Sequence, residues 1–539
     1  MAINVADKVK EFDKLKAERY NFNDLWQSVA HYCIPRKANI TTIRMPGEEL
    51  YTDIYDSTGR ISSQVMAAGL ASYLTNPSSK WFSLRVQDED LMKAEGIGVW
   101  LKECEERIYD ALNSSNFNHQ IYECYRELGI FGTATLYEEE DEKDLVRFYS
   151  RPVREIYILE NKRGEVEEVF RYFEFTAKQA YELFGEQCGE KVQKLLKDNP
   201  NEKLLFLHWV GRRDVRTVGK KDSENMPYAS VWIEHSTKHL CKEGGYEDFP
   251  FFVVRFEKNS GEKYGYSPAI NVLPNIRGVN RMKKDILEAS EKMIKPPLDV
   301  PDDGYVLPID TSPDAINYHD STLDKDQRIK ALLPDNSYNG LPITSEMIRE
   351  EQETIKKAFF VDLFLMLTEQ KGMTATEVMQ RMNEKMLILS PVLGRLMSEL
   401  LDKIITRTFN ILLRAGKLPI VPSALEDSDY VIEYISPLAK AQKAYESQSL
   451  QQYAEALGMM QPLFPDIVDI INADEWGRTL ADIKGISPQI IRSEEEIVEI
   501  RAARAEAQRV QQETEEAMQA VDAYQKVASV EPKEQPSEV

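Results

Sequence analysis

Three side chains of types that bind zinc lie close together in the sequence: His235, His239 and Cys241. A structural zinc site takes four ligands at regular spacing, and no fourth ligand follows at such a distance. The acidic run from Glu138 to Asp144 carries the oxygen ligands that suit divalent cations. Such a site needs ligands that converge from several segments, and a solvated turn between two strands explains the same run. We therefore predict no metal site at either position.

A loop rich in bases follows the apolar run LLFLHWVG (204–211). Its basic residues are Arg212, Arg213, Arg216, Lys220 and Lys221. In an acidic chain this loop is the clearest candidate for a contact with the phosphates of DNA. A solvated loop, or an ion pair with an acidic neighbouring subunit, explains the same cluster equally well.

The sequence contains none of the short motifs that mark common active sites. The string nearest to a phosphate-binding G-x-x-x-x-G-K-[ST] loop, Gly219-Lys220-Lys221, lacks both the spacing and the hydroxyl. There is no G-x-S-x-G, no H-E-x-x-H and no G-x-G-x-x-G after a strand, and the six histidines are dispersed. These features favour a structural assembly protein without a cofactor over an enzyme.

The composition narrows the class of protein further. A length of 539 residues suits about two to four domains, and 42% hydrophobic residues can fill their cores. The formal charge of −23 argues against a protein that wraps nucleic acid with a basic surface. Five scattered cysteines without a C-x-x-C pair are typical of reduced thiols in a cytosol. The sequence shows neither the apolar core of a signal peptide nor a run of about 18 apolar residues that would span a membrane.

The elements that organise the chain lie between residues 271 and 415. Apolar residues at helical spacing predict a first helix that ends at Lys295, because the two prolines that follow cannot continue it. A second helix is predicted over 344–364, with a Thr or Ser N-cap and acids in its first turns. The insert between them, 296–343, carries seven prolines and nine acids against three bases, and we interpret it as a small module that the two helices present.

A long third helix is predicted over 374–415, after an interruption at 365–373. Thr374 and Glu377 fit a capping box, and Gly416 supplies the stop. Its apolar stripe includes Val378, Met382, Leu389, Leu393, Leu396, Leu400 and Ile404.

The remaining segments predict a mixed α/β body and a helical C-terminal part. Residues 4–34 are interpreted as one amphipathic helix that packs on its own subunit, the alternative being an arm that reaches a neighbour. Further helices are expected at 56–74, 94–114, 118–129, 177–184, 439–457, 463–472 and 475–483. Strands are expected at 80–86, 132–140, 145–150, two short segments within 153–175, 204–211, 228–235, 249–257 and 429–436. The run 493–530 has only a thin apolar stripe, so this helix needs partners, which self-assembly around an axis would supply.

In order and spacing, these stretches resemble the portal, or head-to-tail connector, proteins of short-tailed (podovirus-type) bacteriophages. The shared pattern is a long helix, a protruding module, a second helix, a short interruption and a longer helix. The stretches that carry the resemblance are GLASYLTNPSSKWFSL (69–84), GYSPA (265–269), MIKPP (293–297), MTATEVMQRMNEK (373–385), LSPVLGRL (389–396) and ISPLAKAQ (435–442).

The resemblance implies a predominantly helical α+β portal fold that forms rings and has a C-terminal helical extension. The implied parts are a wing (1–270), a first stem helix (271–295), a clip (296–343), a second stem helix (344–364), a tunnel loop (365–373), a long wing helix (374–415), a return strand of the wing (416–436), a crown (437–490), a barrel-like helical extension (491–530) and a disordered tail (531–539).

The resemblance also implies a function and a set of partners. A homo-dodecameric ring would occupy a unique capsid vertex of the virion, after assembly in the host cytoplasm, and duplex DNA would be packaged and ejected through it. The implied partners are the terminase motor, tail adaptor or nozzle proteins, the major capsid and scaffold proteins and internal ejection proteins, with no membrane. The ATPase that pumps the DNA would be a separate chain.

Candidate contact residues follow from the same resemblance. Glu369, Gln370 and Lys371 would face DNA from the tunnel loop, whose alternative is an ordinary turn between helices. We expect a largely acidic lumen, to which DNA does not stick, with Lys356 and Lys357 as a candidate cationic ring. Candidate clip contacts to the terminase or tail adaptor are Asp302, Asp303, Asp310, Asp314, Asp320 and Asp324.

Two other classes of protein remain as alternatives at this point. One is a scaffold or capsid-associated assembly protein that oligomerises without conducting DNA. The other is an enzyme whose site has no recognisable motif. The symmetry and mass of the particle in solution distinguish all three.

Overall fold

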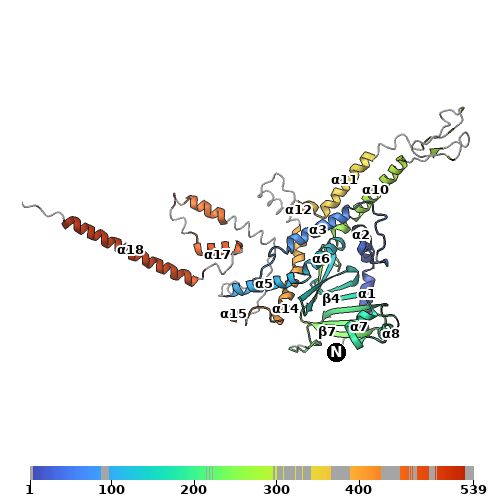
Figure 1. The fold of residues 1–539 in the computed structure, drawn as a ribbon, viewed down its shortest axis with the longest axis horizontal. Coiled ribbons are helices and arrows are strands. Elements are labelled where there is room, and N and C mark those ends of the chain that lie inside the picture. The colour runs from blue at the N-terminus through green and yellow to red at the C-terminus, as the bar shows by residue number, and fades with distance from the viewer. Residues whose placement is uncertain are drawn as a thin grey trace, which may run out of the picture. The chain divides into compact units, whose positions relative to one another are not determined.

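The structure is a computed structural model that describes residues 4–528 with gaps. The gaps are 46, 87–95, 214, 218, 221, 295–297, 300–307, 309–317, 319–321, 323–329, 332–340, 366–388, 427–449, 461, 463, 465–469, 485–491 and 493. The chain divides into two compact units, one formed by Met1–Asp88 with Lys102–Ser436 and the other by Glu89–Leu101 with Pro437–Val539. The first unit contains helices and strands, and the described residues of the second unit form helices, as predicted. Figure 1 shows the elements.

The N-terminal segment forms two helices rather than the single helix predicted over 4–34. Helix α1 (Val5–Glu18) and helix α2 (Tyr20–Cys33) meet at Arg19. The Arg19 side chain is buried and donates hydrogen bonds to the backbone carbonyls of Val153, Arg154 and Ile156. A buried guanidinium with a fixed set of acceptors therefore holds the junction, which the apolar spacing alone did not reveal.

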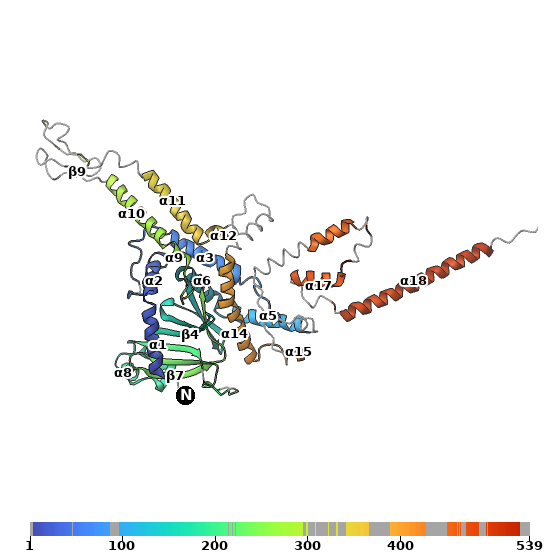
Figure 2. The ribbon, with the colours of Figure 1, turned by 180° about the vertical axis from the view of Figure 1, so that it is seen from behind.

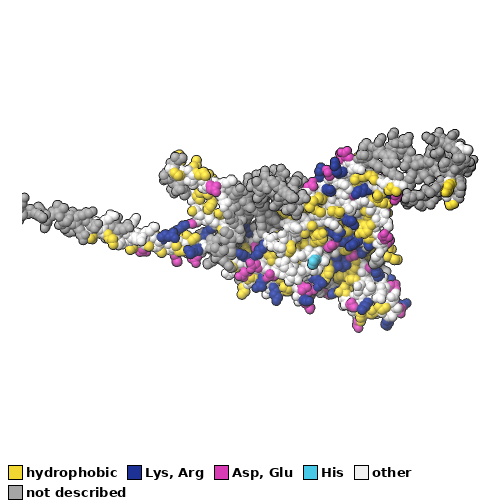
Figure 3. All heavy atoms as spheres, turned by 45° about the horizontal axis from the view of Figure 1, so that its top comes forward, with side chains coloured by type: hydrophobic (Ala, Val, Ile, Leu, Met, Phe, Trp, Pro, Cys, Tyr) yellow, Lys and Arg dark blue, Asp and Glu magenta, His cyan; other side chains and the backbone are white. Residues whose placement is uncertain are grey.

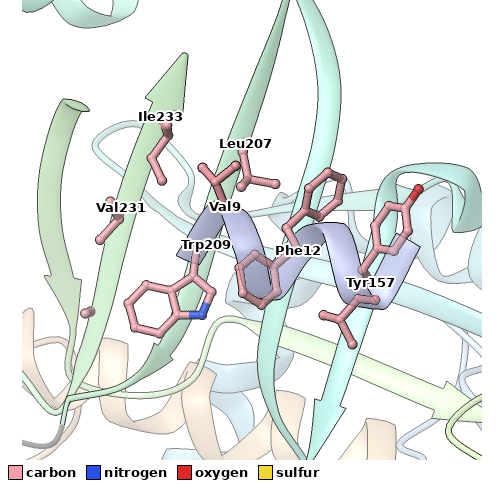
Figure 4. Packing of buried hydrophobic residues seen from close by; sticks show 10 residues of the cluster. Val9, Phe12, Tyr157, Leu207, Trp209, Val231 and Ile233 are labelled. Atoms are coloured by element: carbon pink, nitrogen blue, oxygen red, sulfur yellow. The ribbon is translucent and has the colours of Figure 1, made fainter. Parts of the chain in front are cut away.

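A five-stranded antiparallel sheet carries α1 on one face. Its strands follow in chain order: β3 (Ile156–Glu160), β4 (Val166–Thr176), β5 (Lys203–Arg212), β6 (Tyr228–Glu234) and β7 (His239–Tyr246). Figure 4 shows Val9 and Phe12 of α1 against Leu207 and Trp209 of the sheet, and all four side chains are buried. The interpretation that this helix packs on its own subunit is thereby confirmed.

The connection between β4 and β5 is helical and covers one end of this sheet. It consists of α7 (Ala177–Phe184), the short 3-10 helix η3 (Gly185–Gln187) and α8 (Glu190–Asp198). Phe184 and Val192 pack with Phe206 of β5 in a second apolar cluster. We did not predict α8 or the edge strand β7. Helix α8 is short, although Val192, Leu195 and Leu196 recur at helical spacing, and the segment of β7 contains two glycines and little apolar alternation.

A three-stranded sheet joins distant parts of the first unit in the order β2-β1-β8. Strands β1 (Thr133–Asp141) and β2 (Leu145–Arg151) form the predicted hairpin, and β8 (Phe251–Arg255) pairs with β1. Helices α5 (Ile97–Ser114) and α6 (Phe117–Phe131) precede the hairpin, as predicted. Two short 3-10 helices, η1 (Pro35–Lys37) and η2 (Val153–Glu155), follow α2 and β2.

The prediction of a strand over 80–86 is wrong, although its two anchors are buried. Trp81 and Phe82 are 5% and 1% exposed, but the segment 81–85 has no strand pairing. The Phe82 N–H donates to the Tyr109 hydroxyl at 2.6 Å, and that hydroxyl donates back to the Phe82 carbonyl at 3.1 Å. A side chain of α5 thus satisfies the backbone groups that a sheet neighbour would otherwise pair.

The helices predicted at the centre of the chain are present with shifted boundaries. They are α3 (Thr58–Leu74), α10 (Leu273–Ile294), α11 (Leu341–Ala358) and α12 (Val361–Leu365). The short helix α9 (Pro268–Asn271), which we did not predict, precedes α10. The helix predicted over 344–364 begins earlier, at Leu341, and is broken before α12, where Phe360 has a φ of +56°. A Phe residue rarely adopts this left-handed conformation. The apolar spacing continues through Phe359 and Phe360, so the sequence gives no sign that the helix breaks there.

The described part of the long third helix begins at residue 389. It continues through a π-helical turn, Met397–Leu401, into α14 (Asp402–Arg414), and α15 (Ser423–Glu426) follows. Leu393, Leu396 and Leu400 of the predicted stripe are buried, and Gly416 has the left-handed φ of +64° expected of a stop.

The insert 296–343, the interruption at 365–373 and the strand expected over 429–436 lie mainly or wholly outside the described residues. Of the insert, strands β9 (Leu298–Asp299) and β10 (Lys330–Ala331) are paired. The second unit contains a helix over 450–460, α17 (Ala473–Lys484) and the 35-residue α18 (Glu494–Ala528), as expected from the sequence, while most of the helix expected over 463–472 is not described. Among the described residues, no helix is both long and apolar enough to cross a membrane.

Candidate functional site, the helical hairpin and its supports

Helices α10 and α11 run side by side and project together from the first unit (Figures 1 and 2). We refer to these two helices as the helical hairpin. Ile276 and Val279 of α10 and Ile348 and Ile355 of α11 are buried. The Asn275 amide of α10 donates to the Glu351 carboxylate of α11 at 2.6 Å, which fixes the register of the two helices.

One buried carboxylate ties both arms of the hairpin to the start of α3. Asp56 accepts hydrogen bonds from Lys283 of α10 at 2.6 Å, from Gln352 of α11 at 2.7 Å and from the Thr58 N–H at 2.8 Å. Its side chain is 3% exposed. Burial acts to raise the pKa of Asp56, but the hydrogen bonds from Lys283, Thr58 and Gln352 outweigh it and lower the pKa below 3.8.

A second polar side chain supports the same junction. The Asn280 side-chain oxygen accepts the N–H groups of Tyr55 and Asp56 at 2.7 and 3.2 Å, and its amide donates to the Asp53 carbonyl at 3.0 Å. Asn280 lies on the apolar side of α10 and is 9% exposed. The segment before α3 therefore holds the hairpin through side-chain bonds rather than through apolar packing alone.

Replacing Asp56 by alanine is expected to destabilise the first unit by about 2 kcal/mol, because it removes the shared acceptor of partly buried donors from three elements. Since the folded-state pKa of Asp56 is lowered, its contribution is present above pH 3.8 and is lost as the pH falls through the folded value. Urea unfolding at neutral pH measures the loss. Lys178→Ala, which breaks only an exposed pair with Glu182 on the same helix, should change stability by less than about 0.5 kcal/mol.

Close packing of α3 on α12 fixes the segment that follows the hairpin. A Cβ atom on Gly69 would lie 2.2 Å from ring carbons of Phe364, whereas real Cβ atoms do not approach other atoms so closely. Gly69 of α3 thus admits the aromatic side chain of α12. Residue 69 opens the first stretch on which the family resemblance rests.

The long helix is clamped to β8 through Arg255, whose side chain is 2% exposed. Glu399, in the π-helical turn, accepts from the Arg255 backbone N–H at 3.0 Å and from its guanidinium. The same guanidinium donates to Glu160 of β3 and to the Gly164 carbonyl, the latter at 3.0 Å. A π-helical turn contains one more residue than an α-helical turn. Here the turn includes Glu399, which supplies a carboxylate of this clamp.

A second clamp corrects our interpretation of the acidic run Glu138–Asp144. Glu138 is not solvated but fully buried in β1, where its carboxylate accepts from the Thr408 hydroxyl at 2.8 Å and lies 3.7 Å from Nε of Arg407. Burial raises the pKa of Glu138 to about 8. We assigned Glu138 to a solvated turn, whereas β1 continues to Asp141 and all of its residues from Thr133 to Glu138 are buried.

The burial of Glu138 predicts an unusual dependence of stability on pH. Because its folded pKa of about 8 exceeds the unfolded value of 4.5, the native state holds this proton more tightly, so stability falls as the pH rises from 4.5 to 8. Glu138→Gln keeps the shape but cannot ionise. Urea unfolding at pH 5 and pH 8.5 should show the Gln variant gaining on the wild type at the higher pH. An equal difference at both pH values would contradict the assignment.

The sequence-predicted site residues are only partly described. Lys356 and Lys357 are exposed in the last turn of α11 and form no ion pair with any described residue. The tunnel-loop candidates Glu369, Gln370 and Lys371 lie outside the described residues. So do the six clip candidates Asp302, Asp303, Asp310, Asp314, Asp320 and Asp324. Lys and Arg side chains are visible on the hairpin next to the residues drawn in grey (Figure 3).

The other candidate sites of the sequence have ordinary explanations. In the basic loop, Arg213 pairs with Glu243 of the same chain at 2.8 Å and Arg212 lies 3.6 Å from Glu167, while Arg216 and Lys220 are exposed. His239 Nε2 lies 3.0 Å from the Gln187 carbonyl, and Cys241 is buried. Among the described residues no group of three His, Cys, Asp or Glu side chains is placed to hold a metal ion.

Side-chain bonds of Asp56 and Asn280 thus hold a two-helix projection on a mixed α/β body. The chain belongs to the family of bacteriophage head to tail connecting proteins, whose model matches residues 7–491. It is similar to a protein named probable portal protein from Bordetella phage BPP-1, with 30% identity over 534 residues that cover 98% of this chain and 96% of the relative. It is also 29% identical over 508 residues to the portal protein of Salmonella phage epsilon15, covering 92% of this chain and 90% of that protein.

Proposed function

We propose that this protein is a phage portal protein, which forms a dodecameric ring at a unique capsid vertex through which duplex DNA is packaged and ejected. The observation that carries the proposal is the family match over residues 7–491, together with near full-length similarity to two portal proteins. The helical hairpin lies in the part of the chain where the resemblance placed the stem. The ring would belong to the virion and would assemble in the host cytoplasm.

The physical properties of the chain suit a conduit for DNA. Helix α10 has 22 residues and is therefore about 33 Å long, enough for the wall of a channel segment. The chain's charge of −23 limits the phosphate contacts that would make DNA adhere during passage. Anchorage by Asp56 and Asn280 keeps the hairpin rigid relative to its supports. No catalytic step is proposed for this chain, and the energy for translocation would come from a separate terminase.

The parts of the proposed ring follow the sequence. Residues 1–270 and 374–436 would form the wing, 271–295 and 344–364 the stem, and 296–343 the clip. The clip would dock the terminase first and the tail adaptor or nozzle proteins later through its acidic residues. Residues 365–373 would form the tunnel loop, 437–490 the crown and 491–530 a helical extension inside the capsid, near the scaffold, capsid and internal ejection proteins.

Electron microscopy and native mass spectrometry of the purified full-length protein test this function. We expect closed rings with an axial hole and a mass that is a multiple of 62.0 kDa corresponding to a dodecamer. A shell-like or irregular assembly would favour a scaffold protein instead. A monomer at every concentration and salt condition, even with capsid protein present, would reject the portal assignment.

The proposed cationic ring at the end of α11 predicts a packaging defect without an assembly defect. Neighbouring residues of a helix point about 100° apart, so Lys356 and Lys357 cannot both face the same surface. Lys356→Gln and Lys357→Gln are therefore compared separately, and we expect the variant whose side chain faces the channel to reduce packaged DNA several-fold. Nuclease-protected DNA in assembled heads measures the yield, with ring formation as the control. Wild-type yields from both variants would remove these lysines from the channel.

A further inference from the structure

Three bases form a row on the outer side of α10. Arg277, Arg281 and Lys284 are spaced four and three residues apart, so they share one face of the helix. All three are exposed. At about 100° per residue, their face lies opposite Val279, which is fully buried on the side that packs within the subunit. We call these residues the basic row.

Three acids form a matching row on the outer side of α11. Glu346, Glu350 and Glu353 have the same spacing of four and three residues and are exposed. Their face lies opposite the fully buried Ile355. We call these residues the acidic row. Each row points away from the core of its own subunit.

Neither row is neutralised within the subunit. Arg277, Arg281 and the three glutamates form no ion pair with another described residue, and Lys284 has only Glu288 of its own helix at 3.7 Å. Like charges four residues apart on a helix repel each other, and opposite charges four residues further on, such as Asp285 after Arg281 and Lys357 after Glu353, offset part of that repulsion.

Two members of each row lie near the same level of the hairpin. The hydrogen bond between Asn275 and Glu351 sets the register of the two antiparallel helices. Counting outward from this contact, Arg277 stands two residues beyond Asn275 and Glu350 one residue beyond Glu351, while Arg281 stands six residues and Glu346 five residues beyond it. Copies related by rotation about an axis along the hairpin would therefore bring bases and acids to matching heights.

We propose that the basic row of one copy pairs with the acidic row of the next copy, an inference that rests on the ring of the proposed function. Two different surfaces of each subunit then meet head to tail, which is the arrangement that generates a closed ring. Exposed ion pairs add little affinity, but they select orientation and register. A neighbour docked in the reverse orientation, with like rows together, would bring equal charges into contact.

Charge reversal of each row tests this pairing in the full-length chain. Arg277→Glu with Arg281→Glu makes both rows acidic, and Glu346→Arg with Glu350→Arg makes both basic. We expect each double variant alone to lose rings, and a mixture of the two to form rings in which they alternate one to one. Native mass spectrometry counts the two kinds of subunit. Lys194→Glu with Lys197→Glu, on exposed positions of α8, is the matched control for the first variant and should form rings alone.

The outcomes separate this inference from the function on which it rests. Rings from either reversed variant alone, as abundant as those of the wild type, would overturn the pairing and leave the portal assignment intact. Failure of the wild type itself to form rings would remove both. Circular dichroism and thermal unfolding of the unassembled variants test whether they fold. We expect them to fold, because the substituted side chains are exposed. A variant with all four reversals restores opposite charges and should form rings by itself. If the double variants failed only because they misfold, the variant with all four reversals would fail as well.

Discussion

Arg255→Met is expected to destabilise the first unit by about 3–4 kcal/mol, because it leaves Glu399 and Glu160 as largely buried carboxylates without their cation. Arg255 also donates to the Gly164 carbonyl, so the substitution removes the side-chain bonds that join β8 to the long helix and to the turn between β3 and β4, while the backbone N–H of residue 255 still donates to Glu399. Lys258, 2.6 Å from Glu160, offsets part of the charge on that carboxylate. Urea unfolding followed by tryptophan fluorescence measures the change.

A surface ion pair of similar composition serves as the control. Arg414 is 35% exposed and pairs with Asp248 and Glu140 at 2.7 and 2.9 Å. Arg414→Met should cost less than about 1 kcal/mol, since solvent screens these charges. Adding Glu160→Gln and Glu399→Gln to Arg255→Met should recover part of the loss. No recovery would mean that packing of the arginine, rather than its charge, carries the clamp.

Gly132→Ala is expected to cost about 3 kcal/mol or more, from two independent causes. Gly132 has a φ of +74°, a conformation that costs other residues about 1–2 kcal/mol. Its added Cβ would also lie 2.4 Å from the carbonyl oxygen of Gly265 and 2.5 Å from the carbonyl carbon of Tyr266, and backbone atoms cannot move aside cheaply. Overpacking of this kind adds about 1–3 kcal/mol. Thermal unfolding of the purified protein measures the sum.

Gly416→Ala isolates the conformational part of that cost. Gly416 has a similar φ of +64°, but its added Cβ would meet no atom within 4 Å. It should therefore lose only about 1 kcal/mol. If the two alanine variants were equally destabilised, the close approach between the segments around Gly132 and Gly265 would not contribute.

Helical periodicity and proline punctuation were sufficient to predict most elements of the fold. The apolar spacing from Ile276 to Met293 and the prolines after Lys295 defined α10 to within one residue at its end. The hairpin of β1 and β2 was predicted as two strands with an acidic turn between them, although β1 extends into the acidic run as far as Asp141. These features depend on local physics, namely which face of an element is apolar and where the backbone cannot continue.

The predictions were wrong where a side chain far away in the sequence forms hydrogen bonds with the backbone groups of a segment. The helix expected over 4–34 divides at Arg19, whose acceptors lie about 130 residues away. The segment 81–85 forgoes sheet pairing because Tyr109 supplies both of its hydrogen-bond partners at Phe82. No spacing rule applied to a short window includes such partners.

For the candidate site, the sequence by itself determined which residues carry charge and which face of each helix they occupy. It fixed the spacing of the basic and acidic rows, because three and four residues make a turn of any α-helix. Only the tertiary structure decided that Asp56 joins both arms of the hairpin, that Glu138 is buried and that two members of each row lie near the same level. The reason is that solvation and distance between segments far apart in the chain are set by packing, which no local pattern encodes.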